Sequence, residues 1–137
     1  MKYLLDVNAL LALGISHHTD HRRVSAWAAS APKSQYLTCS ITELGFVRIA
    51  AQTGVYGFTL QQALSMLNQL RAISDLQLSF IPDGMDVLHL PVCVKNSKQT
   101  TDGHLLQLAG ANDAVLATLD ERIPGAYLIP GVGNSGQ

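Results

Sequence analysis

Short apolar runs alternate along the chain with longer segments in which apolar residues recur at helical spacing. The runs have the length and the apolar character of strands that are buried on both faces of a sheet. The five predicted strands comprise residues 3–5, 36–39, 78–81, 114–119 and 127–129. Most of each strand is therefore expected to be inaccessible to water.

The segments between these strands carry signals of helix starts and ends. Ser40-Ile41-Thr42-Glu43 and Thr59-Leu60-Gln61-Gln62 have the form of capping boxes, so each predicts the start of a helix. Asn8 is placed to open the first helix, and Gly110 is placed to close the last one. The predicted helical segments are residues 9–13, 24–28, 40–51, 60–73, 86–90 and 102–109.

Strands that alternate with helices predict an α/β domain in which helices cover both faces of a parallel sheet. A chain of 137 residues is long enough for one such domain with a substantial core. We expect residues 1–130 to form this domain. Residues 131–137 are rich in Gly, Ser and Asn, and we expect them to form a flexible tail.

The amino-acid composition indicates where the protein is located and whether its surface is covered, but it does not identify an activity. The charged share is 14%, against a typical value of about 25%, so we expect a second copy or a partner to cover part of the surface. The net charge of −1 gives no bulk basicity for nucleic-acid binding. Cys39 and Cys93 form no disulfide framework, no apolar run reaches membrane-spanning length, and the first residues lack the pattern of a signal peptide. We therefore expect a cytoplasmic protein with no membrane association.

Acidic residues occur where the predicted strands and helices meet. Asp6 ends the first strand and Asp120 ends the fourth, while Glu43 and Asp102 lie in the first turns of helices. In an open parallel sheet these positions converge beyond the carboxyl ends of the strands, where ligands bind. Four converging carboxylates require a counter-charge, and ligation by oxygen alone selects Mg²⁺ or Mn²⁺. Such a metal orients a phosphate and activates water for in-line attack.

Each acid also has a structural interpretation. Glu43 can complete the capping box with Ser40, and Asp102 can complement a helix dipole. Asn8 can serve as an N-cap alone. Asp6 and Asp120 favour a functional interpretation, because an unpaired acid at the end of a buried central strand is costly.

Four segments along the chain contain these acids. They are Leu4-Leu5-Asp6-Val7-Asn8-Ala9-Leu10, Thr42-Glu43-Leu44-Gly45-Phe46-Val47-Arg48, Thr101-Asp102-Gly103-His104-Leu105 and Leu116-Ala117-Thr118-Leu119-Asp120. In their order and spacing the segments resemble the PIN-domain ribonucleases and, within them, the toxin half of VapBC toxin–antitoxin pairs. The resemblance covers nearly the whole chain.

The resemblance implies a three-layer PIN-like fold with the sheet order 3-2-1-4-5, which places Asp6 next to Asp120. It implies that the chain is an endoribonuclease that hydrolyses RNA phosphodiester bonds with Mg²⁺ or Mn²⁺. The acids that would bind or orient the metal, and so form the catalytic site, are Asp6, Glu43, Asp102 and Asp120. Asn8 and Thr118 would contact these ligands rather than the metal. A cognate antitoxin and a homodimer are the implied protein partners.

Other side chains and other functions also fit parts of the sequence. His17 and His21 have a spacing that chelates a metal on a helix, but no third ligand lies nearby, so we interpret them as solvated or at the edge of the substrate. Arg48 can contact phosphate or pair with an acid. A haloacid-dehalogenase-like phosphatase would need an acid at position 8 and a lysine after Lys98, and neither is present. A catalytically inactive PIN-like module that binds RNA or protein stays the alternative, which RNA cleavage assays distinguish.

Overall fold

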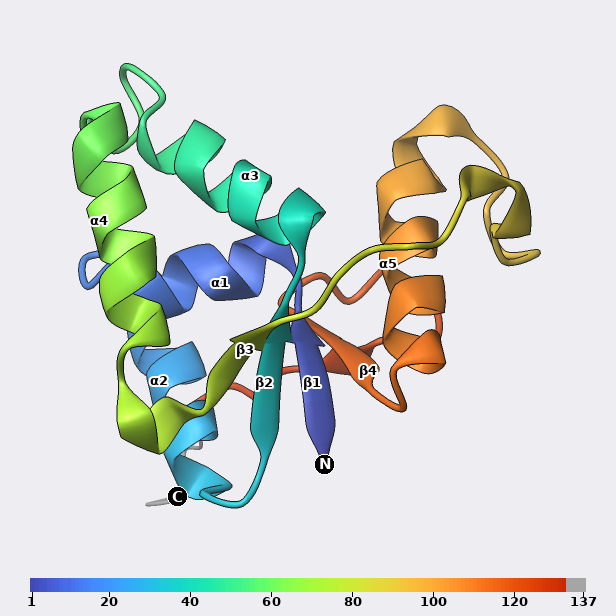
Figure 1. Cartoon of the computed structure of the whole chain (residues 1–137), viewed down its shortest axis with the longest axis horizontal. Coiled ribbons are helices and arrows are strands. Elements are labelled where there is room, and N and C mark those ends of the chain that lie inside the picture. Colours follow the sequence, from blue (N-terminus) through green and yellow to red (C-terminus); the bar gives the residue numbers. More distant parts are fainter. Residues whose placement is uncertain (133–137) are drawn as a thin grey trace.

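The computed structural model describes residues 1–132 and shows a single sheet with helices on both sides (Figure 1). The strands are β1 (Lys2–Leu5), β2 (Gln35–Thr38), β3 (Leu78–Phe80), β4 (Val115–Thr118) and β5 (Tyr127–Leu128). All neighbours pair in parallel, in the order β3-β2-β1-β4-β5. The predicted fold class and strand order are confirmed. Most of the predicted tail, residues 133–137, lies outside the described residues.

Different sets of helices cover the two faces of the sheet. The helices are α1 (Val7–Gly14), α2 (His21–Ser30), α3 (Ser40–Ala50), α4 (Leu60–Arg71) and α5 (Thr100–Ala111), and single 3-10 turns lie at Ser74–Leu76, Val87–His89 and Ser97–Gln99. Helices α1 to α4 gather on one side of the strands and α5 lies on the other (Figure 1). Tyr3 and Leu5 face the core shared with α1 to α4, whereas Leu4 between them faces α5. This alternation follows from the two-residue period of a strand.

One glycine allows two helices to meet beside the end of β1. A Cβ atom at Gly45 would lie 2.6 Å from Cγ2 of Val7, a separation that side chains do not tolerate. Because position 45 has no side chain, α3 can pack closely against the first turn of α1. This close approach brings the start of α3, with Glu43, toward the edge of the sheet where Asp6 lies.

The N-termini of two helices differ from the sequence-based prediction. Helix α1 begins at Val7, so Asp6 rather than Asn8 is its N-cap, and the Asp6 carboxylate accepts a hydrogen bond from the Val7 amide. Helix α3 is capped through Cys39 and Thr42, whose hydroxyl accepts a hydrogen bond from the Cys39 amide at 3.0 Å. The predicted capping box of Ser40 and Glu43 is wrong because Ser40 is already helical. Glu43 is therefore available for other contacts.

The last helix is longer than predicted. Helix α5 continues through Gly110 and ends at Asn112, whose side-chain amide donates to the Leu108 carbonyl at 2.9 Å. Asp113 then adopts the left-handed conformation with φ of 55°, which an acidic residue tolerates better than most residues do. The capping box of Thr59 and Gln62 on α4, in contrast, is confirmed. None of the helices within residues 1–132 has the length and apolar character that crossing a membrane requires.

Candidate active site

Three of the predicted acids act on one another at the carboxyl edge of the sheet. Asp6 directly follows β1, Asp120 follows the neighbouring strand β4, and Asp102 lies in the first turn of α5. The charges of Asp6 and Asp120 both raise the pKa of Asp102, so the three carboxylates share one electrostatic environment. Within residues 1–132, no group of three or more His, Cys, Asp or Glu side chains already has the geometry of a metal site.

Asp6 is the most deeply buried of these acids and is held by neutral donors. Its side chain has 7% relative exposure. The Thr118 hydroxyl donates to Asp6 Oδ2 at 2.8 Å, and the Val7 amide donates to Oδ1 at 2.8 Å. Burial raises the pKa of Asp6 above its usual value, and the Asp120 charge adds to this, while the two hydrogen bonds oppose it. The carboxylate is fixed in position but its charge has no cationic partner within the described chain.

Asn8 and Thr118 join the ends of β1 and β4. Asn8 Nδ2 donates to the Thr118 hydroxyl oxygen at 3.2 Å, and Asn8 Oδ1 accepts from the Leu119 amide at 3.1 Å. The same Thr118 oxygen accepts from the Asp120 amide at 3.0 Å. One buried hydroxyl therefore orients Asp6 and fixes the backbone of Asp120. Thr118 contacts Asp6 directly, whereas Asn8 reaches the acids only through Thr118 and the Leu119 backbone.

Asp102 is half-buried, and burial is the main reason that its pKa lies above the usual value. Asp120 has the opposite shift. Its pKa is lowered by hydrogen bonds from Arg122, whose Nε lies 3.0 Å and whose Nη2 lies 3.3 Å from the two Asp120 carboxylate oxygens. The Arg122 backbone amide also donates to Asp120 Oδ1 at 3.0 Å.

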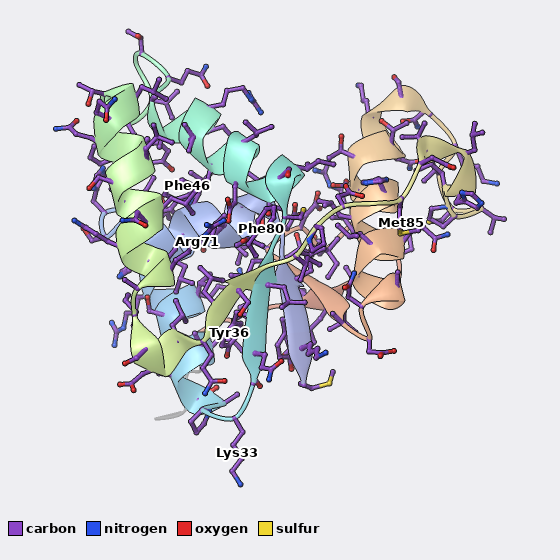
Figure 2. The ribbon with its side chains drawn as sticks, viewed as in Figure 1. Lys33, Tyr36, Phe46, Arg71, Phe80 and Met85 are labelled. Atoms are coloured by element: carbon purple, nitrogen blue, oxygen red, sulfur yellow. The ribbon has the colours of Figure 1, made fainter. Side chains whose placement is uncertain are left out.

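Glu43 binds an arginine of the same chain instead of the aspartates. Its Oε2 accepts a hydrogen bond from the Thr38 hydroxyl at 2.5 Å and from Arg71 Nε at 3.0 Å, and it forms an ion pair with Arg71 Nη2. The Arg71 guanidinium also lies 5.2 Å from the centre of the Phe80 ring, and the two side chains adjoin in Figure 2. Glu43 is thus held between β2, β3 and the end of α4.

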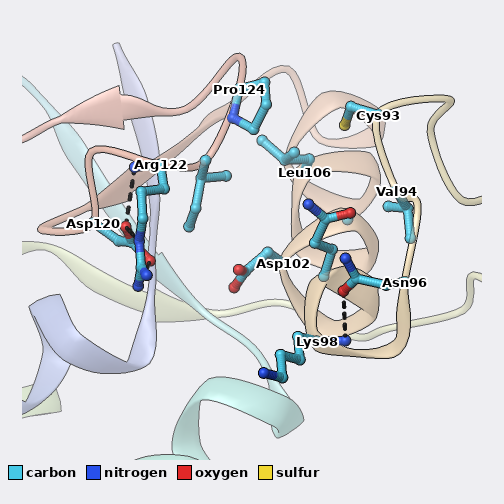
Figure 3. A pocket seen from close by; sticks show the side chains of 12 residues that line it. Cys93, Val94, Asn96, Lys98, Asp102, Leu106, Asp120, Arg122 and Pro124 are labelled. Atoms are coloured by element: carbon cyan, nitrogen blue, oxygen red, sulfur yellow. Dashed lines mark hydrogen bonds and ion pairs between the residues drawn. The ribbon is translucent and has the colours of Figure 1, made fainter.

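A cavity of about 310 Å³ opens beside Asp102 and Asp120 (Figure 3). Its polar lining residues include Asn96, Lys98, Gln99 and Arg122 in addition to the two aspartates. Apolar side chains from α5 and from the segments before and after it complete the wall. Asp102 and Asp120 therefore line a cavity that is open to solvent on one side, and they do not lie on a flat surface.

The histidines take no part in this edge. His17 packs against the rings of Tyr56 and Phe58, and His21 Nδ1 lies 2.7 Å from the Ala12 carbonyl oxygen. The buried His104 pairs with Asp83 at 2.6 Å, which gives it a structural role away from the acids. His17 and His21 therefore do not chelate a metal together.

Two functional candidates escaped the sequence analysis, Arg71 and Arg122. Arg122 stands two positions after Asp120, a spacing that allows a local turn with an ion pair, so the sequence carried a weak signal for it. Arg71 is 28 positions from Glu43, and no local pattern connects the two.

A parallel sheet of this order, with acids at the carboxyl ends of its two central strands, defines a PIN-like nuclease domain. No protein-family model matches the chain. Ribonuclease VapC44 of Mycobacterium tuberculosis, however, is 35% identical over 128 residues, which cover 90% of this chain and 89% of the relative. Ribonuclease VapC38 of the same species is 35% identical over 121 residues, 85% of this chain and 84% of the relative.

Two solved structures share the fold at low sequence identity. VapC20 of Mycobacterium tuberculosis, described as a toxin that cleaves the sarcin–ricin loop, matches with a TM-score of 0.65 at 11% identity, over 93% of this chain and 99% of that one. VapBC2 from Rickettsia felis, bound to a DNA fragment from their promoter, matches with a TM-score of 0.56 at 17% identity, over 93% and 97%.

The chain belongs to the VapC family of ribonucleases, the toxins of VapBC toxin–antitoxin pairs. This membership confirms the predicted family and the predicted class of enzyme. The phosphatase alternative is thereby set aside.

Proposed function

We propose that this chain is a metal-dependent endoribonuclease whose reacting centre is the edge formed by Asp6, Asp102 and Asp120. The observation that carries the proposal is geometric: Asp6 and Asp120 follow the paired strands β1 and β4, and the charges of both act on Asp102 in the first turn of α5. Membership of the VapC ribonuclease family supports the choice of RNA as substrate.

The donor set suits a hard divalent cation. Asp6, Asp102 and Asp120 offer carboxylate oxygens only, and no nitrogen or sulfur ligand belongs to the three, so they fit Mg²⁺ or Mn²⁺. When bound, such an ion polarises the scissile phosphate and lowers the pKa of a water molecule that attacks it. Glu43, the fourth predicted ligand, would have to leave Arg71 to join the set.

The neighbouring residues prepare this centre. Thr118 and Asn8 fix the direction of the Asp6 carboxylate and the backbone of Asp120 before any ligand arrives. Arg122, which is largely exposed beside Asp120, is placed to contact a phosphate oxygen of the substrate. Thr118 and Asn8 supply orientation and no charge, since their hydroxyl and amide groups do not ionise at neutral pH.

The test is cleavage of an end-labelled single-stranded RNA by the purified protein with Mg²⁺, with Mn²⁺, and with excess EDTA. We expect cleavage with either metal, none with EDTA, and products that carry 5′-phosphate and 3′-hydroxyl ends, because a water molecule attacks rather than the ribose 2′-hydroxyl. Equal cleavage in EDTA would contradict the proposal, as would 2′,3′-cyclic phosphate ends.

We also propose a homodimer and a cognate antitoxin as protein partners. The low charged share and the exposed apolar side chains Leu44, Leu60 and Leu64, which have relative exposures of 70%, 57% and 44%, support surfaces that partners cover. The VapBC2 structure joins that toxin with its antitoxin, which supports the same kind of partner for this chain. Light scattering that gives a monomer at all concentrations would contradict the dimer.

A further inference from the structure

The cavity beside Asp102 and Asp120 has two unlike walls. The charged part of the lining includes Asp102, which extends from α5 toward the Asp120–Arg122 pair (Figure 3). The rest of the lining includes an apolar wall made by Val94, Leu106, Ile123 and Pro124. A water-filled groove for a phosphate backbone would not need such a wall. Its presence indicates a ligand that has one apolar face.

The remaining lining side chains offer hydrogen-bond donors. Asn96 uses its Oδ1 to accept from the Lys98 amide at 3.0 Å, and Gln99 uses its Oε1 to accept from the Lys95 amide at 2.6 Å. Both amide NH₂ groups therefore point away from the hydrogen bonds that hold the loop, and neither donates to another of the described residues. With the ammonium group of Lys98, they form a rim of donors around an apolar interior.

The apolar wall depends on a missing side chain. A Cβ atom at Gly103 would lie 2.3 Å from Cγ2 of Val94 and 3.3 Å from Cδ of Pro91. Because α5 carries glycine at this position, the segment with Val94 can pack onto the helix and close the cavity. Gly103 directly follows Asp102, so the same helical turn supplies an acid of the reacting centre and the space for the wall.

From these features we infer that the cavity binds a single unpaired nucleotide of the substrate, next to the phosphodiester bond that is cleaved. The base lies against Val94, Leu106 and Ile123, the amides of Asn96 and Gln99 donate to its acceptor atoms, and Lys98 and Arg122 contact its phosphate. The volume of about 310 Å³ is at the lower end of the range for small-ligand sites, roughly 300 to 1,000 Å³, which suits one nucleotide and not a longer segment. Proteins read RNA sequence mainly through bases that have left the stack, as such a site requires. This inference rests on the proposed ribonuclease function.

Cys93 provides a probe of the cavity that needs neither mutation nor catalysis. Its thiol lies in the lining and in Figure 3 stands beside Leu106, whereas Cys39 is completely buried in the core. The native protein with Mg²⁺ is treated with N-ethylmaleimide alone, with each of the four nucleoside 5′-monophosphates, and with inorganic phosphate or ribose 5-phosphate. Labelling of both cysteines is followed by peptide mass spectrometry.

We expect at least one nucleotide at saturation to slow the labelling of Cys93 by roughly tenfold, because a base that stacks in the cavity covers Cys93 in its lining. Inorganic phosphate and ribose 5-phosphate should give much less protection, because they lack the base. Cys39 should stay unlabelled throughout, which shows that the protein is folded. Equal protection by phosphate and by all nucleotides would overturn the inference.

A matched pair of variants tests the donor rim. Gln99→Glu keeps the acceptor for the Lys95 amide but replaces the NH₂ donor in the cavity with a negative charge. Gln62→Glu does the same at the capping box of α4, where Gln62 Oε1 accepts from the Thr59 amide, outside the cavity lining. We expect Gln99→Glu to weaken nucleotide protection of Cys93 and to raise the KM for RNA by roughly tenfold, with Gln62→Glu unchanged.

The outcomes separate this inference from the proposed function. Protection of Cys93 by nucleotides without any RNA cleavage would support a nucleotide site and contradict the ribonuclease. Metal-dependent cleavage with no protection, and with Gln99→Glu indistinguishable from Gln62→Glu, would leave the ribonuclease standing and overturn the cavity as a nucleotide site. Equal melting temperatures of the two variants establish that the difference is local.

Discussion

Asp6 and Asp120 follow two neighbouring strands, but their charges meet different partners. Asp6 is buried and contacts only neutral donors, the Thr118 hydroxyl and the Val7 amide. Asp120 is more exposed and is paired with the guanidinium of Arg122, and Glu43 is paired in the same way with Arg71. Burial raises the pKa of Asp6, whereas Arg122 lowers the pKa of Asp120.

This difference divides the site into a rigid side and an adjustable side. On the Asp6 side, hydrogen bonds between two strands fix the carboxylate and leave its charge for a ligand from outside. On the Asp120 side, an arginine of the chain itself already neutralises the charge, and a metal or a phosphate has to compete with it. The first side should govern the rate of cleavage, and the second should govern how tightly charged ligands bind.

The largest effect is expected from Asp6→Asn. The asparagine amide has the size of the aspartate side chain but lacks the negative charge that binds a metal ion. Cleavage should therefore fall by about a hundredfold or more. The fold should stay intact, because the change removes an uncompensated buried charge. Cleavage rate and melting temperature with and without Mn²⁺ measure both effects.

Asp75→Asn is the matched control for this change, because Asp75 is exposed on a 3-10 turn that precedes β3 and lies away from the carboxyl ends of the strands. It should leave cleavage and melting temperature as in the unaltered protein. If Asp6→Asn unfolds the protein or stays fully active, the rigid side of the site has been misassigned.

Thr118→Val should have the next largest effect. It removes the hydroxyl that donates to Asp6 and accepts from the Asp120 amide, in a side chain with no exposure. Leaving these partners unsatisfied should lower the free energy of unfolding by about 1–3 kcal/mol. Cleavage should fall by roughly tenfold or more, since the orientation of Asp6 is lost. Thr118→Ser restores the hydroxyl and should recover most of the rate; if it does not, the methyl group is what matters.

The pH dependence of stability should separate the two sides without any mutation. The raised pKa values of Asp6 and Asp102 mean that their protonated forms favour the folded state. Their contribution is complete below the unfolded pKa of about 4 and is lost as the pH rises through the higher folded values. Asp120 has a lowered pKa, so its ionised form favours the folded state. Its contribution to the free energy of unfolding is lost as the pH falls through the pKa of Asp120 in the folded protein.

Urea unfolding of the metal-free protein from pH 4 to pH 8 measures this balance. We expect the Asp6→Asn variant to lose less stability than the unaltered protein as the pH rises, and Mg²⁺ to offset the loss in the unaltered protein. An identical pH profile for both proteins would show that Asp6 has no raised pKa in the folded state.

The smallest effect is expected from Arg122→Gln. The Arg122 side chain is 84% exposed, so its loss should change the melting temperature very little. Without the guanidinium, the Asp120 carboxylate should bind Mn²⁺ severalfold more tightly, as measured by titration calorimetry. Unchanged or weaker Mn²⁺ binding would contradict an arginine that competes with the metal.

The fold followed from the sequence because its signals are local and repeated. Apolar runs marked each strand to within one or two residues, and the spacing of the runs required parallel connections. The caps were less predictable, since Asp6, Asn8 and Ser40 are all good N-cap residues and only tertiary contacts decide among them. At the end of α5, Asn112 forms the C-cap instead of the expected Gly110, through local hydrogen bonds to the carbonyls of Leu108, Ala109 and Gly110.

The site was predictable where acids end strands and unpredictable where side chains meet across space. Asp6 and Asp120 could be assigned to one edge because parallel strands end on the same side. The partner of Glu43 could not, because Arg71 reaches it only after α4 has folded back along α3. The Val94 wall likewise depends on a loop that no periodicity describes.

The pairing of β1 with β4 also affects what happens during translation. Asp6 is synthesised 112 positions before Thr118, which donates a hydrogen bond to it in the folded protein. A nascent chain that stalls before β4, or a truncated product of a damaged message, contains neither Thr118 nor Asp120. Such fragments lack the strand pair on which the acids are arranged, so the catalytic edge can form only after β4 has been synthesised.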